Sequence, residues 1–456
     1  MKILFFADNF PPERNAQASR VFERARWWVR QGHQVTVITS APNFPEGKLF
    51  PGYRNDWRRV EMREGIRVVR VKTYLAPNRG TWRRAVDFGS FLVSAFFMAT
   101  FEARPDVVAA TSPQPLAGYA GWLTSLVRGC PFVLELSDLW PASMVGVGMR
   151  MPRLLYRALE GAELFLYGRA DWIAPQTEAF AEDLAERGVA REKMTVVRNG
   201  VELEQYQPGP REEALASRVG IEPGDFVAGY FGTLGLAHGL EGLLAAAERL
   251  REGRVRILLM GPGAEREKLI AEVERRGLRR VTVLPACGKE EMPAFWRLLD
   301  VALVHLRDEP VFRTVVPSKI YEAMAMGLPV LLVAPAGEAS RFVAECGAGC
   351  HVAAGDEKGL AGVLEEWSRN ESARARYGAA GRKAAPRFSR ERQASEMARV
   401  FEAARQNEAK ENKDAEKKHR MRGRSAPELR EVGAVGREFA EGRRAAGPGD
   451  SYRAAS

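Results

Sequence analysis

The stretch VVPSKIYEAMAMGLPVLLV, residues 315–333, contains the start of a helix, the end of that helix and a buried strand. Pro317 and Ser318 favour the first turn of a helix, and Gly327 is typical of a helix end. The apolar run VLLV (330–333) is typical of a strand that is covered on both faces of a sheet. A helix that leads directly into such a strand is the repeating unit of a parallel α/β sheet.

The same alternation of strands and helices recurs along the chain in two series. The first series predicts strands at 3–7, 35–39, 66–71, 106–110, 132–136, 172–175 and 194–197, and helices at 14–31, 85–103, 115–128, 152–169 and 177–187. The second series predicts strands at 226–231, 255–260, 281–284, 301–306, 330–333 and 349–353. The segment 199–213 between the two series is rich in turn-forming and charged residues, which indicates a linker.

The sequence therefore predicts two facing, Rossmann-like, doubly wound α/β domains with a ligand cleft between their strand ends. We expect an N-terminal domain at 1–205, a C-terminal domain at 206–388 and a last helix at 389–404 that packs back on the N-terminal domain. Residues 405–456 are rich in charge and poor in large apolar side chains, so we expect this tail to lack order.

Composition narrows the class of protein. The chain has 456 residues, of which 46% are hydrophobic and 28% are charged, and this excludes a fibrous or wholly disordered protein. A net charge of +10 favours anionic ligands. Four cysteines without metal-ligand spacing indicate reduced thiols. The sequence shows neither a secretory signal nor an apolar run long enough to span a bilayer, so we expect a cytoplasmic protein.

Two stretches at strand ends carry candidate chemistry. Lys319 and Glu322 are three residues apart and share one helix face, where the lysine suits a phosphate and the carboxylate suits ribose hydroxyls. A surface ion pair is the structural alternative. The stretch FGTLGLAHGL (231–240) is a glycine-containing turn that leads into a helix, which suits close approach to an anion. An ordinary tight turn, with His238 as a satisfied cap, also explains it.

Residues 1–404 resemble the bacterial two-domain glycosyltransferases of the GT-B fold, in the retaining family 4 (group 1). The resemblance is carried by PSKIYEAMAMGLP, LLMGPGAEREKL (258–269) and RNGVELEQYQP (198–208), which resemble the donor-binding helix, a glycine-bearing loop and the hinge of the family. The N-terminal stretches DNFPPERNAQASR (8–20), APNFPEGKLFPGY (41–53) and ELSDLWPASMVGVG (135–148) resemble the subgroup that builds O-antigen or capsule on a lipid carrier, as in N-acetylfucosamine transferases.

The resemblance implies roles for particular residues. The C-terminal domain would bind a nucleotide sugar, with UDP as the favoured nucleotide and the loop Pro285 to Gly288 against the base. The donor-binding residues would be Gly232, Thr233, His238, Gly261, Arg313, Ser318, Lys319 and Glu322. The N-terminal domain would bind the acceptor through Asn15, Arg20 and Asp138. Asp138, Lys319 and Glu322 would form the catalytic set, and the acceptor hydroxyl would attack from the front face with retention of configuration. A helix-capping role explains Asp138 nearly as well.

The chain departs from the family pattern at several positions. Thr314 stands where the family usually has the first of two glutamates with seven residues between them, and Glu322 matches the second. Thr233 and His238 stand where an arginine and a lysine often contact the diphosphate, and Ser137 replaces an arginine. Phosphate charge would then be met by Lys319, Arg313 and backbone amides, with His238 as a donor. The chain has no Asp-x-Asp pair, so we expect neither a metal nor any other cofactor.

A basic segment precedes an apolar one in the N-terminal domain. Residues 54–84 contain ten Lys/Arg against three Asp/Glu, and FGSFLVSAFFMATF (88–101) follows. This pattern predicts docking on the anionic inner face of the cytoplasmic membrane, where a lipid-linked acceptor presents its sugar. A solvated strand followed by a core helix is the alternative. We expect no nucleic-acid partner.

Two other functions fit the same architecture. A nucleotide-sugar epimerase would also bind a UDP-sugar, and it would act without any acceptor. A non-catalytic scaffold of the GT-B shape would show no nucleotide-dependent thermal shift.

Overall fold

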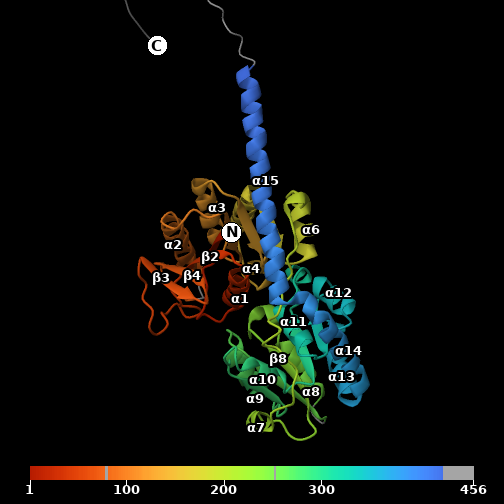
Figure 1. Cartoon of the computed structure of the whole chain (residues 1–456). Helices are drawn as coiled ribbons and strands as arrows, with labels where there is room; N and C mark the ends of the chain where they lie inside the picture. The colour runs from red at the N-terminus through yellow and green to blue at the C-terminus, as the bar shows by residue number, and fades with distance from the viewer. Residues whose placement is uncertain (78–80, 251–252, 425–456) are drawn as a thin grey trace, which may run out of the picture. The chain divides into compact units, whose positions relative to one another are not determined.

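The computed structural model describes residues 1–77, 81–250 and 253–424 (Figure 1). Residues Met1–Ala409 form one compact unit. This unit contains two separate sheets, which correspond to the two predicted series of strands. The α/β fold class is therefore confirmed.

The N-terminal sheet has seven strands in the order β3-β4-β2-β1-β5-β6-β7, and all neighbouring pairs are parallel except β3 and β4. The strands are β1 (Lys2–Phe6), β2 (Gln34–Ser40), β3 (Arg58–Arg63), β4 (Ile66–Val71), β5 (Val107–Thr111), β6 (Phe132–Leu136) and β7 (Trp172–Pro175). The central strands β1, β5 and β6 are buried almost throughout because helices cover both faces of the sheet.

Two apolar cores flank this sheet. One contains residues of α2 (Thr81–Ala99), α3 (Pro115–Arg128), α5 (Arg153–Arg169) and α6 (Glu178–Glu186), and the other contains residues of α1 (Ala16–Arg30) and of the last helix, α15 (Arg390–Arg424). The short α4 (Ala142–Gly146) and the 3-10 turn η1 (Arg191–Lys193) lie in connections.

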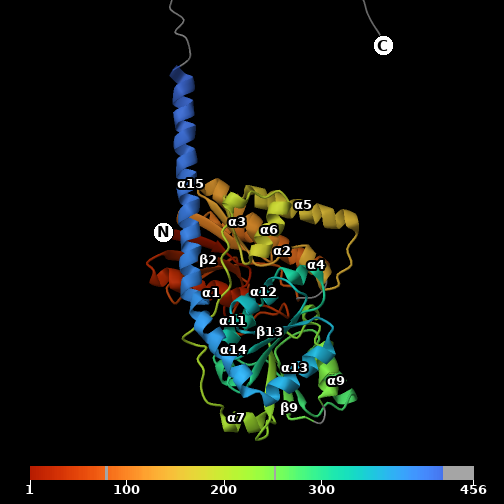
Figure 2. The same cartoon turned by 90° about the vertical axis from the view of Figure 1, so that its right-hand side faces the viewer.

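The C-terminal sheet has six parallel strands in the order β10-β9-β8-β11-β12-β13 (Figure 2). They are β8 (Phe226–Phe231), β9 (Val255–Met260), β10 (Val281–Leu284), β11 (Val301–His305), β12 (Val330–Ala334) and β13 (Gly349–Ala353). One core contains residues of α7 (Glu213–Arg218), α10 (Met292–Trp296), α11 (Ser318–Ala325) and α12 (Glu338–Glu345), and the other contains residues of α8 (Glu241–Arg249), α9 (Arg266–Arg275) and α13 (Glu357–Arg369). Helix α14 (Glu371–Ala384) and the 3-10 turns η2 (Leu236–His238), η3 (Pro310–Arg313) and η4 (Ala385–Phe388) complete this part.

The chain passes between the two sheets twice, and the two passages lie side by side. The N–H of Val201 donates to the carbonyl of Phe388 at 2.9 Å, and the N–H of Arg390 donates to the carbonyl of Val201 at 2.9 Å. Beyond this point α15 returns to the N-terminal domain. The indole of Trp28 on α1 donates to the carbonyl of Ala394 at 2.9 Å and packs edge-on against Phe401, with ring centroids 5.2 Å apart.

Several elements differ from the sequence prediction. The strand expected at 194–197 is wrong, because only a single bridge joins Met194 to Ile173. Strand β3 was not expected, because RRVEMR is mostly polar. It lies at the edge of the sheet, where polar side chains are common. Helix α15 runs on to Arg424, so the expected lack of order from residue 405 is wrong up to that residue, and 425–456 lie outside the described residues. Within the described ranges, no helix is both long enough and apolar enough to cross a membrane.

Candidate active site

Two glycine loops meet at the carboxyl edge of the C-terminal sheet. Gly232 follows β8 and has a φ of +141°, and Gly261 follows β9 and has a φ of +150°. A Cβ atom on Gly261 would lie 1.8 Å from the carbonyl oxygen of Gly232. A Cβ atom on Gly232 would lie 2.8 Å from Nζ of Lys319. Glycine is therefore favoured at both positions, and the Gly232 loop lies against the lysine.

Lys319 is buried next to the Gly232 loop, so the surface ion pair considered as the alternative for Lys319 and Glu322 is wrong. Its side chain is only 7% exposed, and Nζ lies 3.6 Å from the ring centroid of Tyr230. Among the described residues, Nζ has no hydrogen-bond partner. Burial lowers the pKa of Lys319 to about 7, and Glu322 acts in the opposite direction. A buried ammonium group without a partner is costly, so Nζ of Lys319 is a candidate for binding an anion.

Glu322 lies one helical turn after Lys319 on α11. Burial raises its pKa, while Lys289, Arg390 and Lys319 act in the opposite direction. Lys289 and Nε of Arg390 both form ion pairs with Glu23 of α1, the latter at 2.5 Å. Glu322 therefore lies beside a charge cluster that joins the two domains. Sequence reasoning missed this cluster, because its members come from four distant segments.

His238 is held by a reciprocal contact with His305. Its Nδ1 lies 3.3 Å from the carbonyl oxygen of His305, and Nδ1 of His305 lies 2.5 Å from the carbonyl oxygen of His238. A carbonyl can only accept, so both Nδ1 atoms carry the proton and Nε2 of His238 carries a lone pair. Burial, together with Lys319, lowers the pKa of His238 to about 3. The neutral ring thus does not provide the phosphate donor that the sequence predicted.

The remaining predicted donor residues lie around the same sheet edge. Thr233 is exposed in the loop after β8, and its carbonyl accepts a hydrogen bond from the Tyr230 hydroxyl at 2.8 Å. Ser318 is the first residue of α11, and Arg313 is exposed at the end of η3. The next residue, Thr314, accepts a hydrogen bond through its carbonyl from Oγ1 of Thr177 in the N-terminal domain, at 2.7 Å.

In the N-terminal domain, the three predicted acceptor residues already have local partners. Asn15 caps α1 by accepting a hydrogen bond from the N–H of Ala18 at 2.8 Å. Arg20 is buried, with Nε 3.2 Å from Glu135, and it donates to Oγ1 of Thr111 at 3.2 Å. Burial lowers the pKa of Arg20 to about 10. These bonds give Asn15 and Arg20 structural roles in this arrangement.

Asp138 lies in the loop that follows β6, at the carboxyl edge of the N-terminal sheet. Burial raises its pKa to about 6, and the Ser143 hydroxyl acts in the opposite direction. Its own N–H donates to Oγ of Ser112 at 3.3 Å. A carboxyl group with this pKa can hold or release a proton near neutrality.

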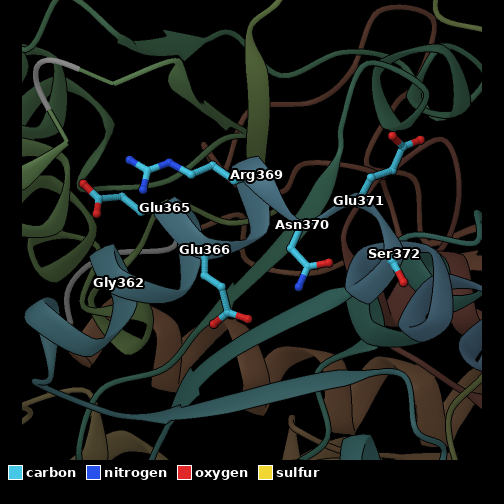
Figure 3. Close-up of a pocket in the computed structure, with 7 residues that line it drawn as sticks. All are labelled: Gly362, Glu365, Glu366, Arg369, Asn370, Glu371 and Ser372. Atoms are coloured by element: carbon cyan, nitrogen blue, oxygen red, sulfur yellow. The ribbon is translucent and has the colours of Figure 1, made fainter.

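A shallow hollow of about 640 Å³ lies far from these residues, at the junction of α13 and α14 (Figure 3). It is lined by Gly362, Glu365, Glu366, Arg369, Asn370, Glu371 and Ser372. Three carboxylates against one arginine do not suit a diphosphate, so we do not assign the donor to it. In the described part of the chain, no three His, Cys, Asp or Glu side chains are grouped to hold a metal ion.

Comparison with known families agrees with this architecture. The model described as "Glycosyl transferase 4-like domain" matches residues 15–200, and the model described as "Glycosyl transferases group 1" matches residues 212–384. The two matches coincide with the two sheets, and together they span most of the chain. The chain is therefore a group 1 glycosyltransferase of the GT-B fold, and it is an enzyme.

Curated relatives are named as glycosyltransferases, and the name of one refers to colanic acid biosynthesis. The colanic acid biosynthesis glycosyl transferase WcaI of Escherichia coli (strain K12) is 27% identical over 346 residues, which cover 74% of this chain and 84% of the relative. The glycosyltransferase WbjE of Pseudomonas aeruginosa is 28% identical over 290 residues, or 61% of this chain and 70% of the relative. These relatives support a role in the synthesis of cell-surface polysaccharide.

Solved structures share the fold. Anabaena HepE in complex with UDP-glucose has a TM-score of 0.67 and 18% identity, and covers 88% of this chain and 100% of its own. WaaG, a glycosyltransferase involved in lipopolysaccharide biosynthesis, has a TM-score of 0.64 and 16% identity, and covers 88% of this chain and 99% of its own. At this level of identity the likeness supports the GT-B fold.

Proposed function

We propose that this enzyme transfers a sugar from a nucleotide sugar, with UDP as the favoured nucleotide, to a lipid-linked acceptor in cell-surface polysaccharide synthesis. The buried and unpartnered Nζ of Lys319, next to the Gly232 loop, is the observation that carries the proposal. The fold neighbour HepE, whose structures contain UDP and UDP-glucose, supports the choice of nucleotide.

In this proposal, Lys319 and the N–H groups that begin α11 receive the diphosphate. A phosphate oxygen next to Nζ favours the ammonium form, so the lysine gains its proton as the donor binds. The fixed positive charge then stabilises the charge that develops on the leaving diphosphate. Glu322 accepts hydrogen bonds from ribose hydroxyls, with the loop Pro285 to Gly288 against the base. The acceptor hydroxyl attacks from the same face, with retention of configuration.

The N-terminal motifs favour the O-antigen or capsule subgroup as the setting of this reaction. They resemble enzymes that extend a sugar on a lipid carrier, as N-acetylfucosamine transferases do. We propose that Asp138, whose pKa is raised by burial, receives a proton or a hydrogen bond from the acceptor.

A membrane-docking face on the N-terminal domain forms part of the proposal. Helix α2 and the turn that follows it expose a stripe of apolar side chains: Trp82 (78% exposed), Val93 and Phe97 on the helix and Phe101 (62% exposed) just after its end. Among the described residues, all exposed large apolar side chains except Leu236 belong to the N-terminal domain. An amphipathic surface of this kind suits the boundary between head groups and acyl chains.

The structure narrows the set of residues that could meet a membrane. Phe91 belongs to the core and not to the exposed stripe. Arg70 is buried and pairs with Glu61 at 2.8 Å. Arg58 and Arg67 both pair with Glu102, at 2.7 and 2.8 Å, and Arg79 lies outside the described residues. Exposed basic side chains next to the stripe include Arg54, Lys72 and Arg83. We propose that these attract an anionic leaflet.

A nucleotide-binding and transfer assay tests the function. We expect UDP to raise the Tm of the wild type and of the control variant Lys358→Met, an exposed lysine on α13, and not to raise that of Lys319→Met. We expect Lys319→Ala to reduce transfer from UDP-sugars to a lipid-linked monosaccharide by at least thirtyfold, which corresponds to about 2 kcal/mol. A protein that no nucleotide stabilises is a scaffold, and one that epimerises the donor without an acceptor is an epimerase. Either result would contradict the proposal.

A further inference from the structure

Glu23 of α1 lies where the two domains meet, and it is buried although it carries a charge. Only 4% of its surface is exposed. One carboxylate oxygen forms an ion pair with Nε of Arg390 at 2.5 Å, and the other forms an ion pair with Nζ of Lys289. A buried carboxylate needs such partners, because the removal of its charge from water is costly. One residue of the N-terminal domain therefore holds two cations from distant parts of the chain.

The pair with Arg390 has a structural role. Nη1 of Arg390 also donates to Oδ1 of Asn199 at 2.6 Å and to Oε1 of Gln393 at 2.8 Å. Asn199 lies in the first passage of the chain between the two sheets, and Arg390 lies in the second. These bonds tie both passages to α1.

The pair with Lys289 reaches a different place, because Lys289 directly follows the loop Pro285 to Gly288. The carbonyl of Lys289 accepts a hydrogen bond from Nε2 of Gln205 at 2.6 Å, and its side chain pairs with Glu23. Lys289 is thus held through its main chain and its side chain by two segments outside its own loop. The first two residues of this loop are exposed. A charge-assisted contact at the end of an exposed loop restricts the positions that the loop adopts.

The same loop approaches the N-terminal domain at a second point. A Cβ atom placed on Gly288 would lie 3.8 Å from Nη1 of Arg14, which precedes α1. Two successive residues, Gly288 and Lys289, therefore lie close to side chains of the N-terminal domain. The position of the loop depends on that domain as well as on its own.

Resting on the proposed function, in which the loop Pro285 to Gly288 lies against the base, we propose that Glu23 is a positioning residue for the nucleotide. It acts through Lys289, whose side chain it holds, and it contacts neither the donor nor the reacting atoms. The affinity for the nucleotide then depends on a residue of the N-terminal domain. Because coupling between two sites is reciprocal, a bound nucleotide stabilises the contact between Glu23 and Lys289 in return.

Calorimetric titration with UDP tests the proposal. Lys289→Met removes the cation next to the loop and leaves the pair of Glu23 with Arg390, whereas Glu23→Gln weakens both pairs. We expect each variant to raise the Kd for UDP by about fivefold or more, and the double variant to raise it no further, because Glu23 acts through Lys289. Lys289→Arg, which keeps the charge, and the control Lys358→Met should bind UDP within about twofold of the wild type.

Kinetics and hydrogen exchange separate positioning from other roles. In both single variants the KM for the UDP-sugar should rise while kcat at saturating donor stays within about threefold of the wild type, since the reacting groups are unchanged. Backbone amides in 286–291 should exchange faster in both variants than in the wild type, because the loop has lost its contact with α1.

The outcomes that would overturn the proposal are distinct. One is an unchanged Kd in Lys289→Met. Another is a raised Kd in Lys289→Met without faster exchange of the loop, or without any loss of affinity in Glu23→Gln, because the lysine would then contact the nucleotide itself. A lower Tm of Glu23→Gln with an unchanged Kd would leave only the structural role with Arg390.

Two further results separate this proposal from the proposed function. If the wild type and both variants bind UDP equally well, the proposed function stands and the positioning role is refuted. A wild type that binds no nucleotide refutes both. Should Glu23→Gln not fold, the affinity and loop exchange of Lys289→Met decide the question, because this variant keeps the buried pair with Arg390.

Discussion

At the scale of single residues, the protonation of Lys319 links donor binding to stability. Burial lowers its pKa to about 7 in the folded protein, whereas an exposed lysine has a pKa of about 10.5. At pH values between these two pKa values, the unfolded chain binds more protons than the folded one. The free energy of unfolding therefore rises with pH in this range. Below pH 7 the folded protein carries the full cost of the buried charge.

We therefore predict that Lys319→Met is more stable than the wild type at pH 7, although it does not transfer sugar. Its advantage should shrink as the pH rises through the window from about 7 to 10.5, because the wild-type lysine is then neutral in both states. Urea unfolding of both proteins at pH 7, 8.5 and 10 measures this difference. Lys358→Met serves as the control and should show no such trend. A difference between Lys319→Met and wild type that does not vary with pH would contradict the burial of a charged lysine.

The placement of several predicted donor residues was readable from the sequence, because these residues are neighbours in the chain or directly follow a strand. Lys319 and Glu322 share one helix face, and Gly232 follows a strand directly, so spacing alone brings them to one sheet edge. The burial of Lys319 was not readable, since it depends on the distant Gly232 loop that lies against it. The neutral state of His238 depends on His305 in another strand. Glu23 and Lys289 belong to different domains, and no local pattern predicts that they are neighbours.

At the scale of elements, α2 presents apolar side chains both to the core of the N-terminal domain and to its surface. Phe91, Ala95 and Met98 enter the core, while Trp82, Val93, Phe97 and Phe101 remain exposed. The helix is therefore apolar on its outer face as well as on its inner face. It exposes a larger apolar area than is usual for a protein surface in water.

We predict that replacing Trp82, Phe97 and Phe101 together by serine abolishes sedimentation with vesicles that contain anionic lipid. The wild type should sediment at low salt and less at high salt, because exposed basic residues and apolar burial act together. Leu236→Ser, the matched control in the C-terminal domain, should sediment like the wild type. Retention of full binding by the triple variant would place the contact elsewhere, and a wild type that ignores these vesicles would refute membrane docking.

Helix α15 stabilises the N-terminal domain through one apolar face. Phe401 is fully buried against Trp28, while the adjacent Glu402 is exposed. We predict that Phe401→Ala lowers the free energy of unfolding by about 3 kcal/mol, through lost burial and the cavity it leaves. Glu402→Ala should change it by less than about 0.5 kcal/mol. Urea denaturation compares the two, and equal effects would show that α15 does not belong to this core.

Most elements follow from hydrophobic patterning, and the failures have physical causes. Buried strands such as β8 and β9 are continuous apolar runs, so their bounds are marked by polar neighbours. Residues 194–197 have a strand-like composition, but only Met194 forms a bridge to the sheet. Residues 405–424 lack an apolar stripe, yet they continue a helix that began on a well-packed face. A helix that has already begun can continue without packing against a core. Composition alone does not reveal this.

At the scale of the whole molecule, we expect the positive charge that meets the donor diphosphate to come from the chain itself. Lys319 and the amide groups of α11 lie at the sheet edge where the diphosphate is proposed to bind, and the sequence has no Asp-x-Asp pair. We predict that EDTA leaves the initial rate of transfer unchanged, measured in protein passed over a chelating resin. Loss of activity on chelation, with recovery on adding Mg²⁺ or Mn²⁺, would show that a metal ion carries part of this charge.

The double passage of the chain between the two sheets also sets the order in which the protein can be completed during synthesis. The C-terminal domain is one continuous segment, but the N-terminal domain needs α15, which is made last. At about 5–20 residues per second, the roughly 190 residues between Val201 and Arg390 take about 10–40 s to translate. Throughout that time Trp28 and its neighbours have no Phe401 to cover them. The nascent N-terminal half is therefore the stage of biogenesis at which this enzyme is most exposed to aggregation and most dependent on chaperones.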